Sequence, residues 1–217
     1  MPGARESLLD AAHKALSRQP WSAVRMVDVA TSAGVSRQTL YNEFGSKEGL
    51  GRALVRREAD GFLAGIERAL AGPGGPCAQL TAAAEWTTSA ARRSPLVRAL
   101  LTGCWEPRLP APALAAVEST SAVPAQRRAD GPLPSPGEFV ALVRDRAAAT
   151  VSGREAAPGS GAGAGSGDGR PEQPDAVDLT RVCELAVRLA LSCVAAPPGE
   201  GGVADLVRTA LPRQLTH

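Results

Sequence analysis

Aromatic residues are scarce in this chain of 217 residues: three Phe, three Trp and one Tyr make up 3% of it. β-branched residues are sparse too, whereas Ala, Leu and Arg are abundant. Because β-branched and aromatic residues favour strands while Ala, Leu and Arg favour helices, this composition predicts an all-α protein. The length allows one or two domains and a substantial hydrophobic core.

The sequence also lacks long apolar runs and paired cysteines. No run of 18 apolar residues is present, so we expect no transmembrane helix. The N-terminal residues MPGARESLLDAAHK include acidic side chains and no long apolar core, unlike a secretory signal. The four cysteines are far apart and form no CxxC pair: Cys77, Cys104, Cys183 and Cys193. We therefore expect a cytoplasmic protein whose cysteines are reduced and buried.

Groups for catalysis are few. There are only two histidines, His13 and the C-terminal His217, and no nucleophile–base or carboxylate pair stands out. We predict no catalytic residue, no metal site and no cofactor, and an enzyme is the weaker hypothesis. Glycines two apart in Ala156–Pro174 resemble a dinucleotide fingerprint, but no strand precedes them, so a flexible linker is predicted.

Charge by itself does not distinguish a DNA-binding protein from an ordinary one here. The net charge is +2, and residues 1–71 hold ten Lys/Arg against eight Asp/Glu, so 10 − 8 = +2 lies there and zero in the remainder. This small excess suits a phosphate-binding face, but an ordinary solvated surface accounts for it equally well.

The stretch Arg25–Phe44, RMVDVATSAGVSRQTLYNEF, predicts two short helices that meet at a tight turn. Apolar residues of the first helix recur at i, i+3, i+4 and i+7: Met26, Val29, Ala30 and Ala33. Gly34 is expected to end that helix and Ser36 to cap the next, with Leu40 and Phe44 pointing inward. A helix, a glycine turn and a second helix with a polar face are typical of a helix-turn-helix, whose second helix enters the DNA major groove.

The longer run DVATSAGVSRQTLYNEFGSKEGL resembles the N-terminal domain of TetR-type transcriptional regulators, over roughly Ser7–Leu54. The family pattern appears here as Ala30, Ala33–Val35, Leu40–Tyr41, Phe44 and Lys47. Arg25 departs from it, because the family commonly has Thr or Ser at the start of this helix. Either Ser22 begins the helix earlier or its cap is missing, which would cost about 1 kcal/mol.

The resemblance implies a DNA-binding domain over residues 1–50, with the helix-turn-helix at about 25–44, and a helical ligand-binding and dimerisation domain over 51–217. It implies contacts with double-stranded DNA by Arg25, Ser36, Arg37, Gln38, Thr39, Tyr41, Asn42 and Lys47. It also implies a homodimer, joined through about 139–152 and 177–193, that reads a palindromic operator and releases it when an unknown small molecule binds.

Helical periodicity continues outside the motif. Helices are predicted over Arg5–Arg18, Lys47–Leu70, Ala78–Arg93, Pro95–Cys104, about Ala113–Glu118, 136–152, Val177–Cys193 and Val203–Leu211. Flexible segments are expected at about 119–134 and 156–174. Trp21 is expected to anchor the core beneath the helix-turn-helix.

The effector pocket is harder to locate from sequence. Six residues are candidates to line it: Trp86, Leu100, Leu101, Cys104, Trp105 and Phe139. Aromatic and leucine residues at helical spacing are more often plain core, so both interpretations stay open. The leading hypothesis is a dimeric repressor that responds to a ligand. The alternative is a DNA-binding regulator that senses no small molecule and is constitutive or controlled by another protein.

Overall fold

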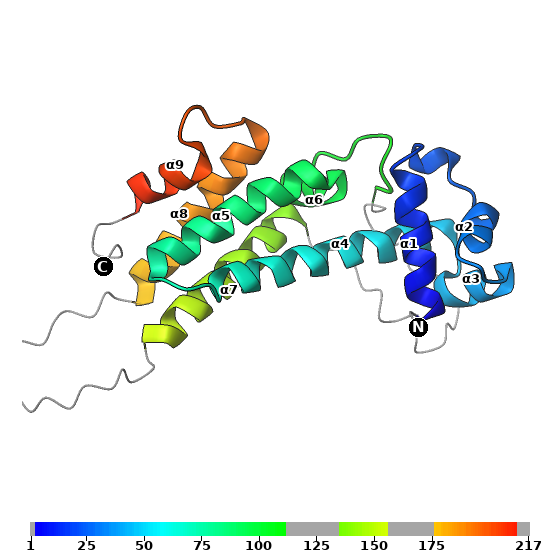
Figure 1. Ribbon diagram of the computed structural model, residues 1–217, viewed down its shortest axis with the longest axis horizontal. Coiled ribbons are helices and arrows are strands. Elements are labelled where there is room, and N and C mark those ends of the chain that lie inside the picture. The colour runs from blue at the N-terminus through cyan, green and yellow to red at the C-terminus, as the bar shows by residue number, and fades with distance from the viewer. Residues whose placement is uncertain (1–2, 112–134, 156–175, 212–217) are drawn as a thin grey trace, which may run out of the picture. The chain divides into compact units, whose positions relative to one another are not determined.

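The computed structural model describes residues 3–111, 135–155 and 176–211 (Figure 1). All regular structure in these ranges is helical, with no strand, as the composition predicts. The short helix expected near Ala113–Glu118 and the segments at 119–134 and 156–174 lie outside the described residues. Within the described ranges, no helix combines the length and the hydropathy that a membrane span requires.

The chain divides into two compact units. The N-terminal unit comprises Met1–Gly61 and Ser94–Ser135, and the C-terminal unit comprises Phe62–Arg93 and Pro136–His217. The division therefore falls within one continuous helix, and it assigns the helix after Ser94 to the N-terminal unit. The resemblance implies a different boundary, between residues 50 and 51, where the DNA-binding domain is expected to end. That boundary stays a prediction.

The N-terminal unit begins with three helices and a short 3-10 turn: α1 Ala4–Leu16, η1 Trp21–Ala23, α2 Met26–Ser32 and α3 Arg37–Phe44. The first three α-helices pack pairwise around buried apolar residues, among them Leu8, Val29 and Leu40. The unit also holds the first part of α4 (Lys47–Leu70) and α6 (Pro95–Thr102). Ser94 caps α6, because its Oγ accepts a hydrogen bond from the Val97 amide at 3.3 Å.

The C-terminal unit contains the end of α4 with α5 (Pro76–Arg93), α7 (Pro136–Glu155), α8 (Ala176–Ala195) and α9 (Gly202–Ala210). α5 packs against α8 and α9, and α7 packs against α8. The rings of Phe62 and Phe139 lie 5.5 Å apart in this core. The predicted helices in the described ranges are thus confirmed, with ends that differ by a few residues.

Two leucines of this unit are exposed although they lie near buried residues in the sequence. Leu142 is 41% exposed and Leu185 40%, whereas Phe139 and Ala186 are buried. The residues that α8 buries are small: Cys183, Ala186, Ala190 and Cys193. Helical spacing identifies an apolar side of a helix, but only packing decides which part of that side is covered.

The cysteine prediction holds for three of the four residues. Cys77, Cys183 and Cys193 are buried free thiols, whereas Cys104 is exposed. Cys104 follows Gly103, whose left-handed backbone (φ 72°) ends α6, so it lies outside the buried helix face to which its spacing assigned it.

Helix α4 contains four glycines, and at three of them, Gly49, Gly51 and Gly65, a Cβ would meet another group closely; at Gly49 that group is the Phe44 carbonyl. A Cβ at Gly65 would overlap the indole ring of Trp86, which donates from Nε1 to the Phe62 carbonyl at 3.0 Å. A Cβ at Gly51 would lie 3.0 Å from Pro110 Cβ and 3.2 Å from the Trp21 ring. Close packing, more than flexibility, therefore accounts for these three glycines.

Candidate nucleic-acid interface

The turn between α2 and α3 has the backbone that the sequence predicts. Gly34 has a φ of 69°, in the left-handed region where glycine is favoured, and it follows Ala33, the C-cap residue of α2. Ser36 then caps α3, since its Oγ accepts from the Thr39 amide at 3.0 Å. Arg25 is the N-cap residue of α2 and makes no side-chain cap, so the cap is missing and Ser22 does not replace it.

One face of α3 is buried and the other is open. Leu40 is fully buried and Phe44 is 6% exposed. These two residues therefore fix α3 on the rest of the N-terminal helices; α1, η1, α2, α3 and the start of α4 are called the head below. The Arg5 guanidinium of α1 lies 4.8 Å from the centre of the Phe44 ring. Sequence periodicity did not predict this contact of Arg5, because the two residues lie far apart in the chain.

The opposite face of α3 presents polar side chains to solvent. Arg37, Gln38 and Asn42 are exposed, and Tyr41 is 48% exposed despite its ring. Gln38 Nε2 donates to Asn42 Oδ1 at 2.9 Å, and the hydroxyls of Ser36 and Thr39 are 2.9 Å apart. A single helix surface therefore carries most of the predicted DNA contacts.

Lys47 stands at the start of α4, beside Trp21. Its ammonium donates to the Ser22 carbonyl at 3.0 Å and lies 5.6 Å from the centre of the Trp21 ring. The neighbouring Glu48 has a pKa below its usual value, because its own backbone amide and the Ser46 hydroxyl hydrogen-bond to the carboxylate. The cation of Lys47 is therefore held in place next to an ionised carboxylate.

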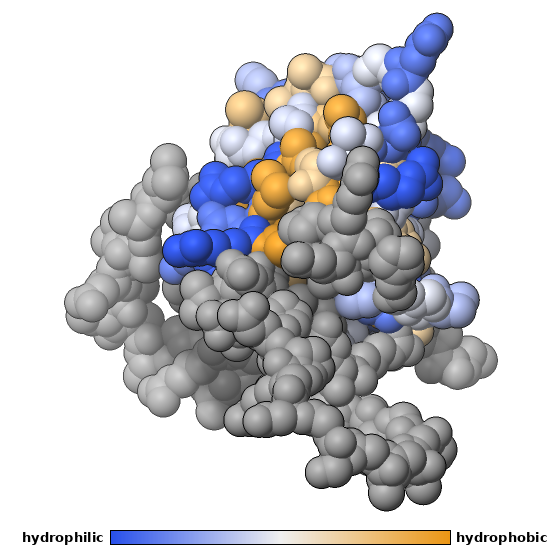
Figure 2. Space-filling view, turned by 90° about the vertical axis from the view of Figure 1, so that its left-hand side faces the viewer, coloured by the Kyte–Doolittle hydropathy of each residue, from blue (hydrophilic) through white to orange (hydrophobic). Residues whose placement is uncertain are grey.

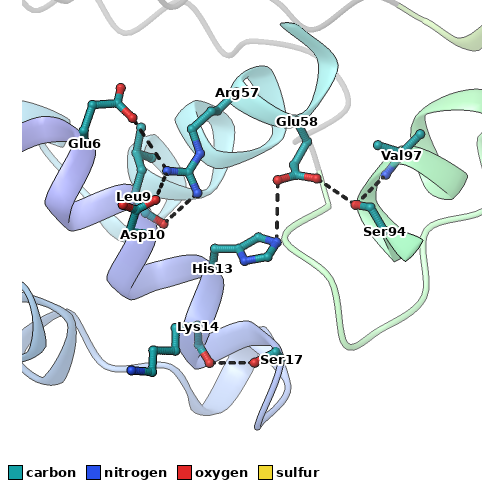
Figure 3. A network of polar contacts seen from close by, with 10 residues as sticks. All are labelled: Glu6, Leu9, Asp10, His13, Lys14, Ser17, Arg57, Glu58, Ser94 and Val97. Atoms are coloured by element: carbon teal, nitrogen blue, oxygen red, sulfur yellow. Dashed lines mark hydrogen bonds and ion pairs between the residues drawn. The ribbon is translucent and has the colours of Figure 1, made fainter. Parts of the chain in front are cut away.

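Polar contacts fix α1 on α4 (Figure 3). The guanidinium of Arg57 donates to Asp10 at 2.6 Å and to the Leu9 carbonyl at 3.2 Å, and lies 3.7 Å from Glu6. These contacts join the first helix of the head to the long helix that leaves it.

Glu58 joins α4 to two further elements of the N-terminal unit. One carboxylate oxygen lies 3.6 Å from His13 Nε2 of α1, and the other accepts from the Ser94 hydroxyl at 2.7 Å (Figure 3). Within the described residues, no group of three His, Cys, Asp or Glu side chains is placed to hold a metal.

Comparison with known proteins identifies the family of this head. Residues 8–54 match the family profile described as "Bacterial regulatory proteins, tetR family". This N-terminal segment is similar to the TetR family of bacterial regulatory proteins. The matched region contains α2, α3 and the start of α4, and therefore every residue of the open face described above.

Two curated relatives match part of the chain. The HTH-type transcriptional regulator AlkX of Mycobacterium tuberculosis (strain ATCC 25618 / H37Rv) is 39% identical over 106 residues, which are 48% of this chain and 50% of AlkX. The HTH-type transcriptional repressor ComR of Escherichia coli (strain K12) is 38% identical over 66 residues, 30% of this chain and 31% of ComR. The chain thus spans about half and a third of the lengths of these relatives.

The fold is similar to that of a solved TetR family repressor. The crystal structure of the TetR family repressor AlkX from Dietzia sp. strain DQ12-45-1b aligns with a TM-score of 0.52 and 20% identity, over 98% of each chain. At this identity the alignment describes the fold alone.

Two hollows lie in the C-terminal unit. One is an internal cavity of about 10 Å³, lined by apolar residues and one hydroxyl: Ile66, Leu80, Ala83, Ala84, Thr87, Val143, Ala147, Ala186, Val187 and Ala190. The other is open to solvent beside Trp86 and holds about 430 Å³. The Thr87 hydroxyl donates to the Ala83 carbonyl of its own helix at 2.8 Å, so it is already satisfied.

The six predicted pocket residues occupy different environments. Trp86 lines the open hollow, and the other five line neither of the two hollows described above. Leu100, Leu101 and Phe139 are buried, Trp105 is half-buried and Cys104 is exposed. Their role in a pocket stays a prediction.

Proposed function

We propose that this protein is a sequence-specific DNA-binding transcriptional regulator that acts in the cytoplasm as a homodimeric repressor. The observation that carries the proposal is α3, a helix capped by Ser36 and fixed from behind by Leu40 and Phe44, with its polar face open. A major groove about 12 Å wide admits one such helix. An ordinary solvent-exposed helix face is the alternative. The cap at Ser36, the buried Leu40 and Phe44 and the match to the family profile together favour DNA binding.

The side chains of α3 suit distinct contacts with DNA. Gln38 offers a donor and an acceptor together, as adenine requires, and Arg37 can donate two hydrogen bonds to guanine. Thr39, Tyr41 and Asn42 suit methyl, phosphate or base-edge contacts. Arg25, Ser36 and Lys47 lie at helix starts, where backbone phosphates are bound.

A homodimer would supply two heads, because one head reads too few bases for useful specificity. We propose α7 and α8 as the dimer face, over about 139–152 and 177–193. Leu142 of α7 and Leu185 of α8 expose 41% and 40% of their surface, as an apolar contact between two copies requires. Figure 2 shows hydrophobic residues grouped between hydrophilic ones on one face of the molecule. Two copies related by a two-fold axis would read a palindromic operator.

We further propose that a small molecule releases the operator by binding the C-terminal unit better in the form that does not hold DNA. By thermodynamic linkage, DNA must then weaken the binding of this effector by the same factor. The lining of the internal cavity is almost wholly apolar, which suits an apolar effector. Dietzia AlkX is implicated in the biodegradation of n-alkanes, so hydrocarbons are the first class to test.

The small internal cavity also favours a second candidate, a DNA-binding regulator without a small-molecule ligand. A volume of about 10 Å³ is about one water-sized probe sphere, too small for any organic effector unless the helices separate. In this case the protein is constitutive or controlled by another protein.

A gel shift tests the proposed function. Wild-type protein is mixed with the DNA upstream of its own gene and of the divergent neighbour, beside Tyr41→Ala and Lys47→Ala. A salt-sensitive shift that both variants weaken supports DNA reading by α3 and α4. If both variants bind as wild type does, the proposed face is wrong.

A thermal-shift screen then separates the two candidates. Hydrocarbons, fatty acids and aromatic compounds are added to the purified dimer, and hits are added to the operator complex. A compound that raises the melting temperature and releases DNA supports the ligand-responsive repressor. Stabilisation by a compound that leaves the operator complex intact contradicts it.

A further inference from the structure

We propose that the segment Glu106–Ala111, which follows α6 and is called the strap below, positions Lys47 for phosphate binding by holding Trp21. The inference rests on the proposed function, since Lys47 is taken to bind DNA. Trp21 and Lys47 lie in the head. The strap follows α6 in the sequence, more than fifty residues after Lys47.

The strap is bound to the head by a backbone contact. The Trp21 amide donates to the Arg108 carbonyl at 2.8 Å. The strap is itself folded back, because the Leu109 amide donates to Glu106 and the Ala111 amide to Leu109, both at 2.9 Å. Leu109 and Trp21 are each only 9% exposed, so both side chains are buried.

Gly51 of α4 completes the contact. A Cβ at this position would lie 3.0 Å from Pro110 Cβ and 3.2 Å from the Trp21 ring, so both groups rest against the helix where it has no side chain. Gly51 lies four residues after Lys47, on the same side of α4 one turn away. The indole of Trp21 therefore extends along α4 from the strap towards Lys47.

Lys47 is held at the other edge of Trp21. Its ammonium lies 5.6 Å from the centre of the ring and donates to the carbonyl of Ser22, the residue after Trp21. A lysine has a long flexible side chain, and restricting it before DNA arrives reduces the entropy lost on binding. If the strap moves, Trp21 and the Ser22 carbonyl move with it, and Lys47 loses both contacts.

Gly51→Ala tests the inference, with Gly61→Ala as the matched control. Both changes add one methyl group to α4, but a Cβ at Gly61 meets nothing within 4 Å. Each is made in wild type and in a Lys47→Ala background, and binding is measured by fluorescence anisotropy on a generic duplex at several salt concentrations. A generic duplex suffices because phosphate contacts do not depend on sequence.

We expect Gly51→Ala to weaken binding about three- to tenfold, the size of a partly lost phosphate contact, and to lower the salt slope towards that of Lys47→Ala. In the Lys47→Ala background it should have no further effect, and Gly61→Ala should have none in either background. Equal weakening in both backgrounds, or none in wild type, would overturn the inference.

Leu109→Ala gives a second variant that leaves α4 unchanged, in case Gly51→Ala impairs folding. Like Gly51→Ala, it should weaken DNA binding in wild type but not in the Lys47→Ala background. It should also speed hydrogen exchange at the Trp21 amide. Slow exchange there with normal DNA binding would contradict the inference. If the wild-type protein binds no duplex, both the proposed function and this inference are wrong. If the wild type binds DNA but the effects of Gly51→Ala and Leu109→Ala do not depend on Lys47, only the inference is wrong.

Discussion

Gln38 and Asn42 show how one hydrogen bond prepares an exposed side chain for base reading. Gln38 Nε2 donates one of its two hydrogens to Asn42 Oδ1 at 2.9 Å. Its second hydrogen and its Oε1 stay available, and these are the donor and the acceptor that a bidentate contact with adenine uses. Restriction of the amide lowers the entropy that this contact costs.

Gln38→Ala should therefore reduce specificity more than general affinity. We expect a loss of about 1–3 kcal/mol on the operator, confined to one base-pair position of each half-site. Binding to operators randomised at each position measures it. Lys47→Ala is the control, because it should weaken all sequences alike and reduce the salt slope by about 0.9 for each phosphate lost. A uniform loss with Gln38→Ala would show that Gln38 reads no base.

The cysteines differ in the reactivity that their surroundings allow. Burial raises the pKa of Cys183 to about 11, so at pH 8 this thiol is protonated, and the thiolate is the form that reacts. Cys104 is exposed.

We expect a maleimide at pH 8 to modify Cys104 first and to leave Cys183 unmodified until the protein unfolds. Because its pKa lies near 11, the Cys183 thiolate becomes appreciable only as the pH rises towards that value. Mass spectrometry of a time course identifies each site, and Cys104→Ser should abolish the fast phase. Early modification of Cys183 in folded protein would refute this order.

At the scale of the helix, α2 and α3 start differently. Ser36 caps α3 by accepting from the amide three residues on, whereas Arg25 leaves α2 without a side-chain cap. The uncapped start stabilises the fold less, but it provides an exposed cation at the edge of the proposed DNA face.

Arg25→Ser should raise the free energy of unfolding by about 0.5–1 kcal/mol, because the serine can accept from the Asp28 amide as Ser36 does from Thr39. It should also weaken DNA binding, since the cation is lost. Urea denaturation and anisotropy measure the two effects, and Ser36→Ala should lower stability by about 0.5–2 kcal/mol. An Arg25→Ser protein less stable than wild type would contradict the prediction.

Helix α4 shows that glycines in one helix can have opposite roles. Gly65 lies under the Trp86 ring, and the guanidinium groups of Arg68 and Arg93 lie 5.9 and 5.0 Å from the centre of that ring. Gly61 faces open space.

Gly65→Ala should lower the free energy of unfolding by about 1–3 kcal/mol, because the new methyl group displaces the indole. Gly61→Ala should raise it by up to about 1 kcal/mol through helix propensity alone. Thermal and urea unfolding compare the two variants with wild type. Equal effects of the same sign would show that Trp86 does not constrain this position.

For the whole molecule, the proposed function requires two copies of the chain. The exposed leucines of the C-terminal unit include two in the proposed dimer segments, Leu142 and Leu185, and one outside them, Leu206 of α9, which is 43% exposed. This third leucine provides a control of similar exposure.

Leu142→Glu and Leu185→Glu should convert the protein to a monomer, because a charge in an apolar interface is costly to desolvate. Leu206→Glu should stay dimeric. Analytical ultracentrifugation measures the mass, and the monomeric variants should lose at least tenfold in operator affinity, since one head must then bind alone. If Leu206→Glu is monomeric while Leu142→Glu and Leu185→Glu stay dimeric, the dimer interface lies on α9 and the proposed interface is wrong.

The sequence was sufficient for the head because its signals are local. The caps of α3 and α6, the glycine turn and the inward Leu40 and Phe44 each depend on residues within one or two helical turns, so spacing predicts them. Arg5 against Phe44 and Trp21 against Arg108 join residues far apart in the chain, and no spacing encodes them.

The all-α fold, the helix-turn-helix and the side of α3 that is buried were determined by the sequence itself, through propensity, capping and periodicity. Tertiary structure decided that Leu142 and Leu185 are exposed, that Cys104 lies on the surface, and that the residues after α6 pack on Trp21. The reason is physical: an apolar helix side is wider than the area that neighbouring helices cover, and only packing selects the covered part.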